Sequence, residues 1–309
     1  MVHISVVVPV LNEELIVPEL IKRVSIELEK INSSHEIIIV DDGSLDETWD
    51  EIVKESKKFK NVKGFKLSRN FGHHYAISAG LHNSNGDWVV VMDGDLQDRP
   101  EVIPDLYKKA KEGFDVVFVS RVNRPESILY KLLQKTFYKL LTVLSGIKWD
   151  SRQANFSIIS RKVVDSFKEF PENARFYGST IKWLGFDTTF IEAQHGTRFK
   201  GKPSYTFRKR LKLALDIIIA FSDRPLRFAI GLGIAMSAAS LLSFLLIMMR
   251  FYINITDDLL IPTLISLLIL VFGMIFVILG IIGTYLGRVF TEVKKRPLYV
   301  ISKSLNDSD

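Results

Sequence analysis

The sequence predicts an α/β domain with a mostly parallel sheet, followed by an amphipathic interfacial helix and two transmembrane helices. Over roughly the first 120 residues, short runs rich in Val and Ile alternate with segments of helical periodicity. Such near-continuous apolar strands are typical of parallel sheets covered on both faces. The last third contains two long stretches without a charged residue, 228–249 and 259–287. We therefore expect a first domain at 1–204, an interfacial region at 205–225 and a transmembrane hairpin with a short tail at 226–309.

The composition restricts the class of protein. With 309 residues, 47% of them hydrophobic and 25% charged, the chain can hold about two domains and carries additional apolar segments. The absence of cysteine excludes a disulfide scaffold, a thiolate metal site and a cysteine nucleophile. The formal net charge is +6, and nine Lys or Arg residues lie between Arg198 and Arg227. This concentration indicates an anionic partner, which can be a phosphate, a nucleic acid or a lipid headgroup.

Five strands and the helices between them can be assigned in order. The expected strands are 3–9, 36–40, 62–67, 88–92 and 116–119. Asn12 is expected to cap the first helix, and Ser44 with Glu47 forms a capping-box pattern for a helix that ends near Lys58. Another helix is expected at 71–83. The chain begins directly with strand residues, so no secretory signal is visible, and we expect the first domain to stay on the side where it is made.

Two carboxylates follow the apolar strand 88–92. Asp93 and Asp95, separated by Gly94, offer hard oxygen ligands to a divalent cation such as Mg²⁺ or Mn²⁺. The alternative is an ordinary polar turn, because Asp and Gly are common turn residues.

Polar pairs also follow two other strands, Asn12-Glu13 and Asp41-Asp42. The carboxyl ends of parallel strands meet at one edge of a sheet, so these pairs are expected beside Asp93, where α/β sheets bind nucleotides. The sequence contains no G-x-x-x-x-G-K-[ST] loop, and no G-x-G-x-x-G follows the first strand. A nucleotide bound here would have its phosphates neutralised by a metal and by Arg or Lys.

Motifs along almost the whole chain carry a family resemblance. They are 8–14 (VPVLNEE), 41–46 (DDGSLD), 68–73 (SRNFGH), 79–81 (AGL), 92–98 (MDGDLQD) and 182–186 (KWLGF). With the apolar C-terminal third, they resemble the family 2 GT-A glycosyltransferases, and more narrowly the polyprenyl-phosphate glycosyltransferases. That group includes dolichol-phosphate mannose synthases and bacterial undecaprenyl-phosphate glucosyltransferases. The resemblance implies the GT-A nucleotide-diphospho-sugar transferase fold and a bound Mg²⁺ or Mn²⁺.

The resemblance also implies a role for each matching residue. The nucleotide would be bound by Pro9, Asn12, Glu13, Asp41, Asp42 and Asp93. The metal would be held by Asp93, Asp95 and Gln97. Phosphates would be met by Arg121, Arg198 and Lys202.

Simpler roles stay open for several of these residues. Asp42 and Ser44 can merely cap the following helix. Gln97 can be a turn residue, and Arg121 can be a solvated charge at a strand end. Three histidines lack metal-ligand spacing and are expected to pack or to form hydrogen bonds, namely His73, His74 and His195.

One position departs from the family pattern. The segment 154–158 commonly reads Gly-Asp-Phe-Arg-Leu in the family, and its Asp is a candidate catalytic base, but here that position is Asn155. An amide cannot accept a proton as a carboxylate does. The expected acceptor, a lipid phosphate, has a second pKa of about 6 and is already mostly dianionic at neutral pH. Asn155 can then orient this phosphate, and Asp150 is either a substitute base or a turn residue, so the candidate catalytic residues are Asp95, Asn155 and Asp150.

The implied reaction is an in-line displacement at the anomeric carbon of a nucleotide sugar, for which we expect a UDP-sugar. The metal stabilises the departing nucleoside diphosphate, and a single displacement inverts the configuration. A processive polysaccharide synthase would show a Gln-x-x-Arg-Trp motif. Residues 175–183 lack it, which argues against polymerisation.

The C-terminal third explains how a lipid acceptor reaches such a site. Each uncharged stretch exceeds the roughly 20 residues needed to cross a bilayer. Positive residues lie before the first stretch and after the second, for example Arg227 and Arg288, so the first domain and both termini are expected on the cytoplasmic face of a bacterial inner membrane. Residues 205–225 are expected to lie on anionic headgroups, with a soluble surface helix as the alternative. By analogy with the family, a homotetramer is a further expectation that the sequence itself does not establish.

Two other classes of function stay open. A nucleic-acid-binding protein could use the basic stretch, but this stretch has few interleaved aromatic residues and precedes a membrane span, so we expect no nucleic acid. A catalytically impaired scaffold, or a protein that only binds nucleotide sugars, could retain the fold after losing its base, for which Asn155 is the only hint.

Overall fold

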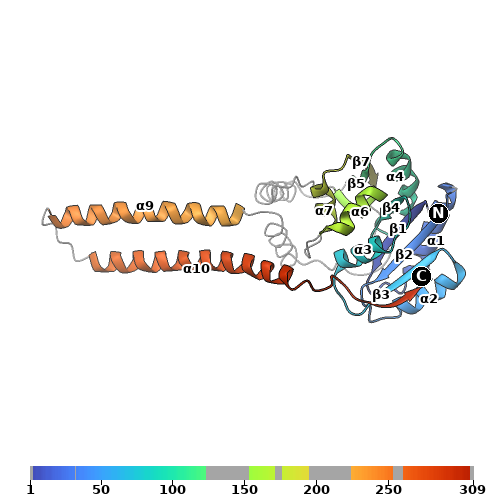
Figure 1. Ribbon diagram of the computed structural model, residues 1–309, viewed down its shortest axis with the longest axis horizontal. Coiled ribbons are helices and arrows are strands. Elements are labelled where there is room, and N and C mark those ends of the chain that lie inside the picture. Colours follow the sequence, from blue (N-terminus) through green and yellow to red (C-terminus); the bar gives the residue numbers. More distant parts are fainter. Residues whose placement is uncertain are drawn as a thin grey trace. The chain divides into compact units, whose positions relative to one another are not determined.

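The computed structural model describes residues 3–31, 33–122, 153–170, 176–194, 224–252 and 260–306 (Figure 1). The chain divides into two compact units. The sheet unit comprises Met1–Lys139, Ile147–Thr206 and Pro297–Asp309, and the helical unit comprises Leu140–Gly146 and Phe207–Arg296. The chain therefore leaves the sheet unit after Thr206 and returns to it at Pro297.

Within the described residues, the sheet unit is built on one sheet of eight strands. They are β1 Ile4–Val10, β2 His35–Asp41, β3 Val62–Leu67, β4 Trp88–Val91, β5 Val116–Val122, β6 Gln153–Ser160, β7 Thr188–Gln194 and β8 Ile301–Leu305. Their order across the sheet is β7-β5-β6-β4-β1-β2-β3-β8. The pairs β1–β2, β1–β4, β2–β3 and β5–β7 are parallel, and the pairs β3–β8, β4–β6 and β5–β6 are antiparallel. The mostly parallel sheet predicted from the Val and Ile runs is confirmed, in a mixed form.

Helices cover both faces of this sheet, which explains why its central strands are mostly apolar. One face carries α1 Val17–Ile31, α2 Thr48–Lys58 and α4 Ile103–Ala110, with the 3₁₀ turn η1 Pro100–Val102 before α4. The other face carries α3 His73–His82, α6 Arg161–Glu169 and α7 Tyr177–Leu184.

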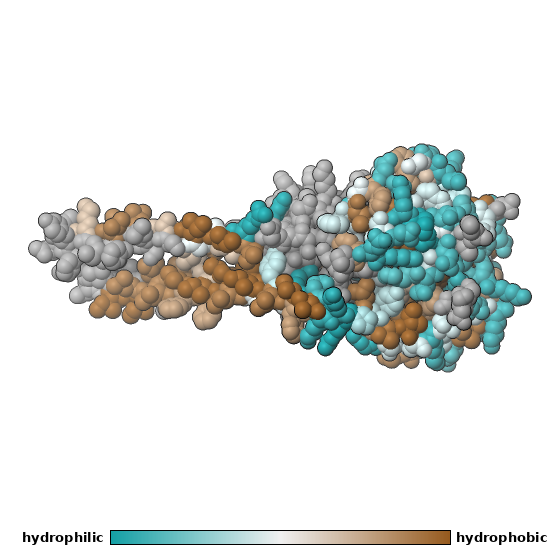
Figure 2. All heavy atoms as spheres, in the orientation of Figure 1, coloured by the Kyte–Doolittle hydropathy of each residue, from teal (hydrophilic) through white to brown (hydrophobic). Residues whose placement is uncertain are grey.

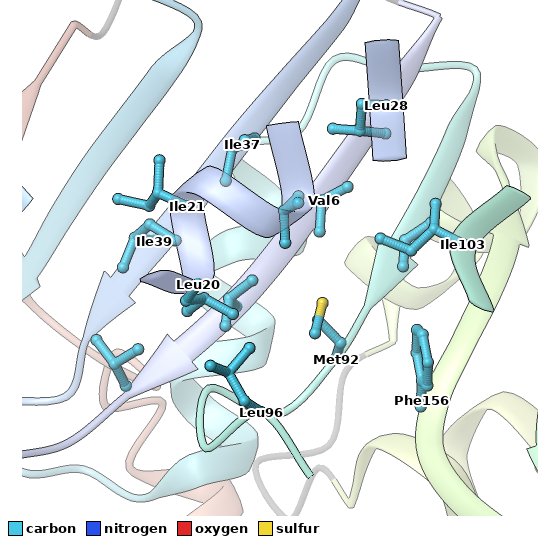
Figure 3. Packing of buried hydrophobic residues seen from close by; sticks show 14 of the residues in the cluster. Val6, Leu20, Ile21, Leu28, Ile37, Ile39, Met92, Leu96, Ile103 and Phe156 are labelled. Atoms are coloured by element: carbon cyan, nitrogen blue, oxygen red, sulfur yellow. The ribbon is translucent and has the colours of Figure 1, made fainter. Parts of the chain in front are cut away.

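Tight packing fixes the strands that end at the site. Figure 3 shows part of the core on the α1 face, with the labelled residues Val6, Leu20, Ile21, Leu28, Ile37, Ile39, Met92, Leu96, Ile103 and Phe156. Burying an aliphatic or aromatic side chain of this size stabilises a fold by about 1.5–3 kcal/mol. The ends of β1, β2 and β4 are therefore held in a fixed register. This limits the movement of the loops that follow these strands.

The helical unit contains α9 Arg224–Tyr252 and α10 Leu260–Val293. Among the described residues, one segment is long and apolar enough to cross a membrane by length and composition, Leu270–Val293, with a mean hydropathy of 2.3. Figure 2 shows hydrophobic side chains along α10. The stretch 228–249 is helical within α9, but its role as a span stays a prediction. Most of the expected interfacial region, 205–223, lies outside the described residues.

The C-terminal tail contains a strand that the sequence did not reveal. β8 pairs with β3 in antiparallel orientation and forms one edge of the sheet. Its sequence, ISKSL, has an apolar residue only at each end, so it lacks the alternation that predicts a strand. Residues 301–305 are thus part of the same sheet as β1.

Candidate active site

Asn12 and Ser44 join the loops that follow β1 and β2. The N–H of Asn12 donates to Ser44 Oγ over 2.9 Å, and Asn12 Oδ1 accepts from the N–H of Leu45 over 3.0 Å. Both residues were expected to cap helices, and that expectation is wrong. The first helix starts at Val17, and the second starts at Thr48 without a side-chain cap. The side-chain oxygens of Asn12 and Ser44 accept hydrogen bonds between the two loops, so neither side chain caps the N–H groups at the start of a helix.

Asp42 holds the β3–α3 loop, residues 68–72, rather than the start of α2. Its carboxylate accepts hydrogen bonds from the N–H of Phe71 over 2.8 Å and from the N–H of Gly72 over 2.9 Å. Burial raises the pKa of Asp42, while these two hydrogen bonds and the charge of His73 oppose the rise. A contact between Asp42 and a nucleotide stays a prediction, but its hold on this loop is a feature of the fold.

Asp41 and Gly43 bind the β2 loop to its neighbours. Asp41 Oδ1 accepts from the N–H of Ser44 over 2.7 Å, and Asp41 Oδ2 lies 3.5 Å from the Nζ of Lys66 on β3. Gly43 has a φ of 72°, and a Cβ built on it would lie 2.4 Å from the carbonyl carbon of Arg69. Only glycine fits this position, so the loops after β2 and β3 act as one rigid element.

The Asp93–Asp98 turn follows β4 and is held by its own carboxylates. The N–H of Asp93 donates to Asp98 Oδ2 over 3.1 Å, and the N–H of Gln97 donates to Asp95 Oδ1 over 3.1 Å. Asp98 is buried, whereas Asp93 and Asp95 are half-buried. The turn therefore presents two carboxylates in a fixed arrangement, as expected of a metal and diphosphate site. The expected role of the Gln97 side chain stays a prediction.

Gly94 brings this turn against the end of β1. A Cβ on Gly94 would lie 3.0 Å from the carbonyl oxygen of Pro9 and 2.8 Å from Val10 Cγ1. Just beyond β1, the N–H of Glu13 donates to Thr48 Oγ1 over 2.8 Å. The loops after β1, β2, β3 and β4 thus converge at one edge, as predicted for carboxyl ends of parallel strands.

His73 lies between Asp93 of the β4 turn and Asn155 of β6. The sequence alone did not place it in the site. Its Nε2 lies 3.2 Å from Asp93 Oδ1 and 3.4 Å from Asn155 Nδ2. Burial lowers the pKa of His73, but the Asp93 carboxylate, helped by Asp42 and Asp98, outweighs burial and raises the pKa above its usual value. The available signal was the place of His73 as the last residue of the SRNFGH motif.

Asn155 lies on β6 in a buried hydrogen-bond chain. Ser157 Oγ donates to the carbonyl oxygen of Asn155 over 2.8 Å and lies 2.7 Å from the hydroxyl oxygen of Tyr177. Tyr177 is fully buried, and burial raises its pKa. The N–H of Tyr177 donates to His74 Nδ1 over 3.4 Å, and the His74 ring packs edge-on against Phe176 with centroids 5.5 Å apart. The backbone of Asn155 is therefore anchored on two elements, β6 and α7.

Several expected site residues fall where the structure gives no side-chain description. Arg121 belongs to β5, but its side chain is not described. Three others lie outside the described residues, namely Asp150, Arg198 and Lys202, and so does His195, which was expected to pack or to form hydrogen bonds. Their roles stay predictions.

The donor set at the turn fits a divalent cation that is shared with a substrate. Among the described residues, no group of three or more His, Asp or Glu side chains is arranged to hold a metal ion. Mg²⁺ usually binds through one or two carboxylates together with substrate phosphates and water. Asp93 and Asp95 supply that number of hard oxygen ligands, so the residues present fit a metal that completes its shell with a diphosphate.

A family model named glycosyl transferase family 2 matches residues 5–167, more than half of the chain. The chain belongs to this family. The uncharacterized glycosyltransferase YkcC of Bacillus subtilis is 36% identical over 98% of this chain and 94% of its own length. The undecaprenyl-phosphate 4-deoxy-4-formamido-L-arabinose transferase of Photorhabdus laumondii is 32% identical over 99% of this chain and 95% of its own length. The resemblance to family 2 and to its polyprenyl-phosphate transferases, stated from the motifs, is confirmed.

Solved structures show the fold of this family 2 protein. Glucosyl-3-phosphoglycerate synthase from Mycobacterium tuberculosis, solved with Mn²⁺, UDP and glucosyl-3-phosphoglycerate, is 20% identical with a TM-score of 0.51. The likeness covers 70% of this chain and 77% of that one. Mannosyl-3-phosphoglycerate synthase from Rubrobacter xylanophilus is 17% identical over 73% of this chain and 74% of its own, also with a TM-score of 0.51. The expected GT-A α/β fold is confirmed.

Proposed function

We propose that this protein transfers a sugar from a nucleotide donor, a UDP-sugar, to polyprenyl phosphate with inversion at the anomeric carbon. The observation that carries the proposal is the place of His73, whose Nε2 lies within 3.4 Å of both the Asp93 carboxylate and the Asn155 amide. The Asp93–Asp98 turn, which would bind the diphosphate, thus lies beside Asn155, which would bind the acceptor phosphate. The full-length match to undecaprenyl-phosphate sugar transferases supports the choice of acceptor.

On the donor side, the β2 and β3–α3 loops would hold the nucleoside, and Asp93 with Asp95 would hold Mg²⁺ or Mn²⁺. The bound cation would neutralise charge on the departing diphosphate. Asp42 would act mainly by fixing the β3–α3 loop, because its carboxylate accepts two backbone N–H groups. The binding of Mn²⁺ and UDP by a structural neighbour of the same fold agrees with this assignment.

On the acceptor side, Asn155 would donate its amide N–H to an oxygen of the lipid phosphate. That phosphate needs no proton acceptor, because its second pKa of about 6 leaves it mostly dianionic at neutral pH. The chain from Tyr177 through Ser157 to the Asn155 carbonyl holds the backbone of this residue in place. Catalysis would then rest on positioning and on charge stabilisation at the leaving group.

The acceptor would come from a bacterial inner membrane, which two helices cross as a hairpin. The chain leaves the sheet unit after Thr206 and returns to it at Pro297. For the whole sheet unit to lie on one side of the bilayer, the chain between these residues must cross the bilayer an even number of times. Arg224 and Arg227 lie at the start of α9, and Arg288 lies near the end of α10, which favours the cytoplasm for the sheet unit. The segment Leu270–Val293 supports one crossing, and α9 is the proposed second.

A transfer assay tests the proposal. The purified full chain, in detergent or nanodiscs, is incubated with Mg²⁺ or Mn²⁺, undecaprenyl phosphate and a panel of UDP- and GDP-sugars. We expect sugar transfer from one donor to the lipid phosphate and none to undecaprenol, which lacks the phosphate. Nucleotide binding without transfer from any donor would instead indicate an impaired, nucleotide-sugar-binding protein. Absence of both transfer and nucleotide binding would overturn the proposal.

A further inference from the structure

The C-terminal residues 299–305, here called the return segment, continue the sheet at the strand that leads into the site. Within this segment β8 runs antiparallel to β3, with Leu305 opposite Gly64 and Ile301 opposite Leu67. The pairing continues past the end of β3, because the N–H of Ser68 donates to the carbonyl oxygen of Val300 over 2.8 Å. Ser68 is the first residue of the β3–α3 loop. The return segment is therefore hydrogen-bonded to the base of that loop.

A bulge lets this short strand pack on both faces of the sheet. Lys66 lies opposite Lys303, and the next residue of β3, Leu67, lies opposite Ile301, so Ser302 is an extra residue in β8. An extra residue reverses the direction of the side chains that follow. Ile301 accordingly packs in the core beside α3, and Leu305 packs in the core beside α2. β8 thus packs against the hydrophobic cores on both faces of the sheet.

The return segment also contacts the C-terminal end of α3, the helix that follows the β3–α3 loop. The ring of Tyr299 lies 6.0 Å from the ring of His82, the last residue of α3, and Tyr299 packs on the same core as Phe71. Between these two contacts lies the β3–α3 loop, whose N–H groups at Phe71 and Gly72 bind Asp42. The loop and α3 are consequently held at the start by Val300 and at the end by Tyr299.

Without the return segment, β3 would be an edge strand. Edge strands expose unpaired N–H and C=O groups, and elements with few buried contacts open locally at low cost. The β3–α3 loop would then lose the pairing at Ser68, while its contacts with Asp42 and Gly43 remain. Lys66, which lies 3.5 Å from Asp41, stands on the same stretch of β3. Loosening this edge would therefore disturb the surroundings of both Asp41 and Asp42.

We propose that the return segment is a positioning element for the nucleotide-sugar donor: it keeps the β3–α3 loop in the conformation that binds the nucleoside. This inference rests on the proposed donor site. Only residues 294–298 separate α10 from the return segment, so the hairpin and the donor pocket share one short covalent connection. The segment is a positioning element and not a catalytic one, because it touches the loop and not the reacting atoms.

The test compares two substitutions and one truncation with the full-length wild type. Tyr299→Ala removes the ring contact with His82, and a chain that ends at Leu298 removes the whole segment. Ser304→Ala is the matched control, because Ser304 is an exposed residue of the same strand. Amide hydrogen exchange of residues 68–72, measured without substrate, reports on the loop, and amides of β1 serve as the internal reference.

We expect Tyr299→Ala to accelerate exchange at 68–72 and to raise the KM for the donor, each by about fivefold, since an aromatic pair is worth about 1 kcal/mol. The KM for undecaprenyl phosphate and the exchange of β1 should stay as in the wild type, and the truncated chain should show a larger effect. Ser304→Ala should change nothing.

Two results would overturn the inference: unchanged loop exchange in Tyr299→Ala, or equal changes in the KM for donor and acceptor together with faster exchange throughout the sheet. If the truncated chain fails to fold, Tyr299→Ala decides alone. Absence of transfer by the wild type would count against the proposed function, whereas the exchange data would still decide whether the segment holds the loop.

Discussion

The ring of His73 faces the side-chain amide of Asn155, with 3.4 Å between Nε2 and Nδ2. The same Nε2 lies 3.2 Å from Asp93 Oδ1, and a carboxylate can only accept, so Nε2–H donates to Asp93. It then has no lone pair for an N–H of Asn155. The consistent arrangement turns the amide by half a rotation, so that its oxygen shares the Nε2–H of His73 with Asp93 and its NH₂ group faces away from that ring.

This arrangement predicts different results for two substitutions of Asn155. Asn155→Ala should lower kcat by about 10- to 100-fold, because a hydrogen bond to a charged group is worth about 1.5–3 kcal/mol. Asn155→Asp keeps an acceptor for His73 but loses the N–H donor to the phosphate, so it should retain a larger part of the kcat than Asn155→Ala. Steady-state kinetics with saturating donor and acceptor measure both. An Asn155→Ala enzyme with the kcat of the wild type would show that this residue does not orient the phosphate.

Gly43→Ala tests the rigid connection between the β2 and β3–α3 loops. The residue has a φ of 72°, and its new Cβ would meet the Arg69 backbone at 2.4 Å, so the β3–α3 loop must move. We expect a loss of about 1–3 kcal/mol in the free energy of unfolding and weaker UDP binding. Thermal melting and UDP titration measure the two effects.

The matched control for this substitution is Gly113→Ala. Gly113 also has a positive φ, 110°, but nothing lies within 4 Å of an added Cβ. Backbone strain alone should then lower stability and leave UDP binding unchanged. Equal UDP affinity in the two variants would contradict the role assigned to the loop contact.

The sequence predicted the elements whose signal is local. The run from Trp88 to Met92 was apolar throughout because β4 is buried on both faces, and the following Asp93 and Asp95 had to lie at the carboxyl edge of the sheet. The same reasoning located the Asp41-Asp42 pair at the end of β2. In each case the strand and the polar residues that follow it are adjacent in the chain, so spacing alone was sufficient.

Features that depend on a distant partner were missed or misassigned. Asn12 and Ser44 have the composition of helix caps, but each bonds a loop more than 30 residues away, and local patterns cannot distinguish these two uses. β8 has too few apolar residues to be recognised and exists because the edge of β3 is available to it. His73 could be assigned to the site only after β4, α3 and β6 were placed together.

Asp95→Ala tests the proposed metal ligand. Removing one of two carboxylates should lower metal-dependent transfer by 100-fold or more, because charge stabilisation by a bound cation is worth several kcal/mol. The variant should also bind Mn²⁺ more weakly in the presence of UDP, and it should stay folded, although it loses the hydrogen bond from the Gln97 N–H. Glu29→Ala, which removes an exposed carboxylate on α1, is the control. Full transfer by Asp95→Ala would show that the metal assignment is wrong.

His74 predicts a loss of stability in acid. Burial lowers its pKa from 6.5 to about 3, and the charge of His73 contributes to the shift. Between these pH values the unfolded chain binds a proton that the folded chain excludes, so the free energy of unfolding falls as the pH decreases through this window. At about pH 5 the loss amounts to about 2 kcal/mol. His73, whose pKa is raised, acts in the opposite direction, so the contribution of His74 must be measured as a difference between variants.

His74→Asn isolates that contribution, because Asn does not titrate and its Oδ1 can accept from the N–H of Tyr177 in place of His74 Nδ1. Unfolding is followed at about pH 7.5, where an unfolded histidine is mostly neutral, and at about pH 5. We expect the wild type to lose more stability than His74→Asn between the two. If both proteins lose the same amount, the imidazole of His74 is not held neutral by the fold, and acid sensitivity must arise from other groups.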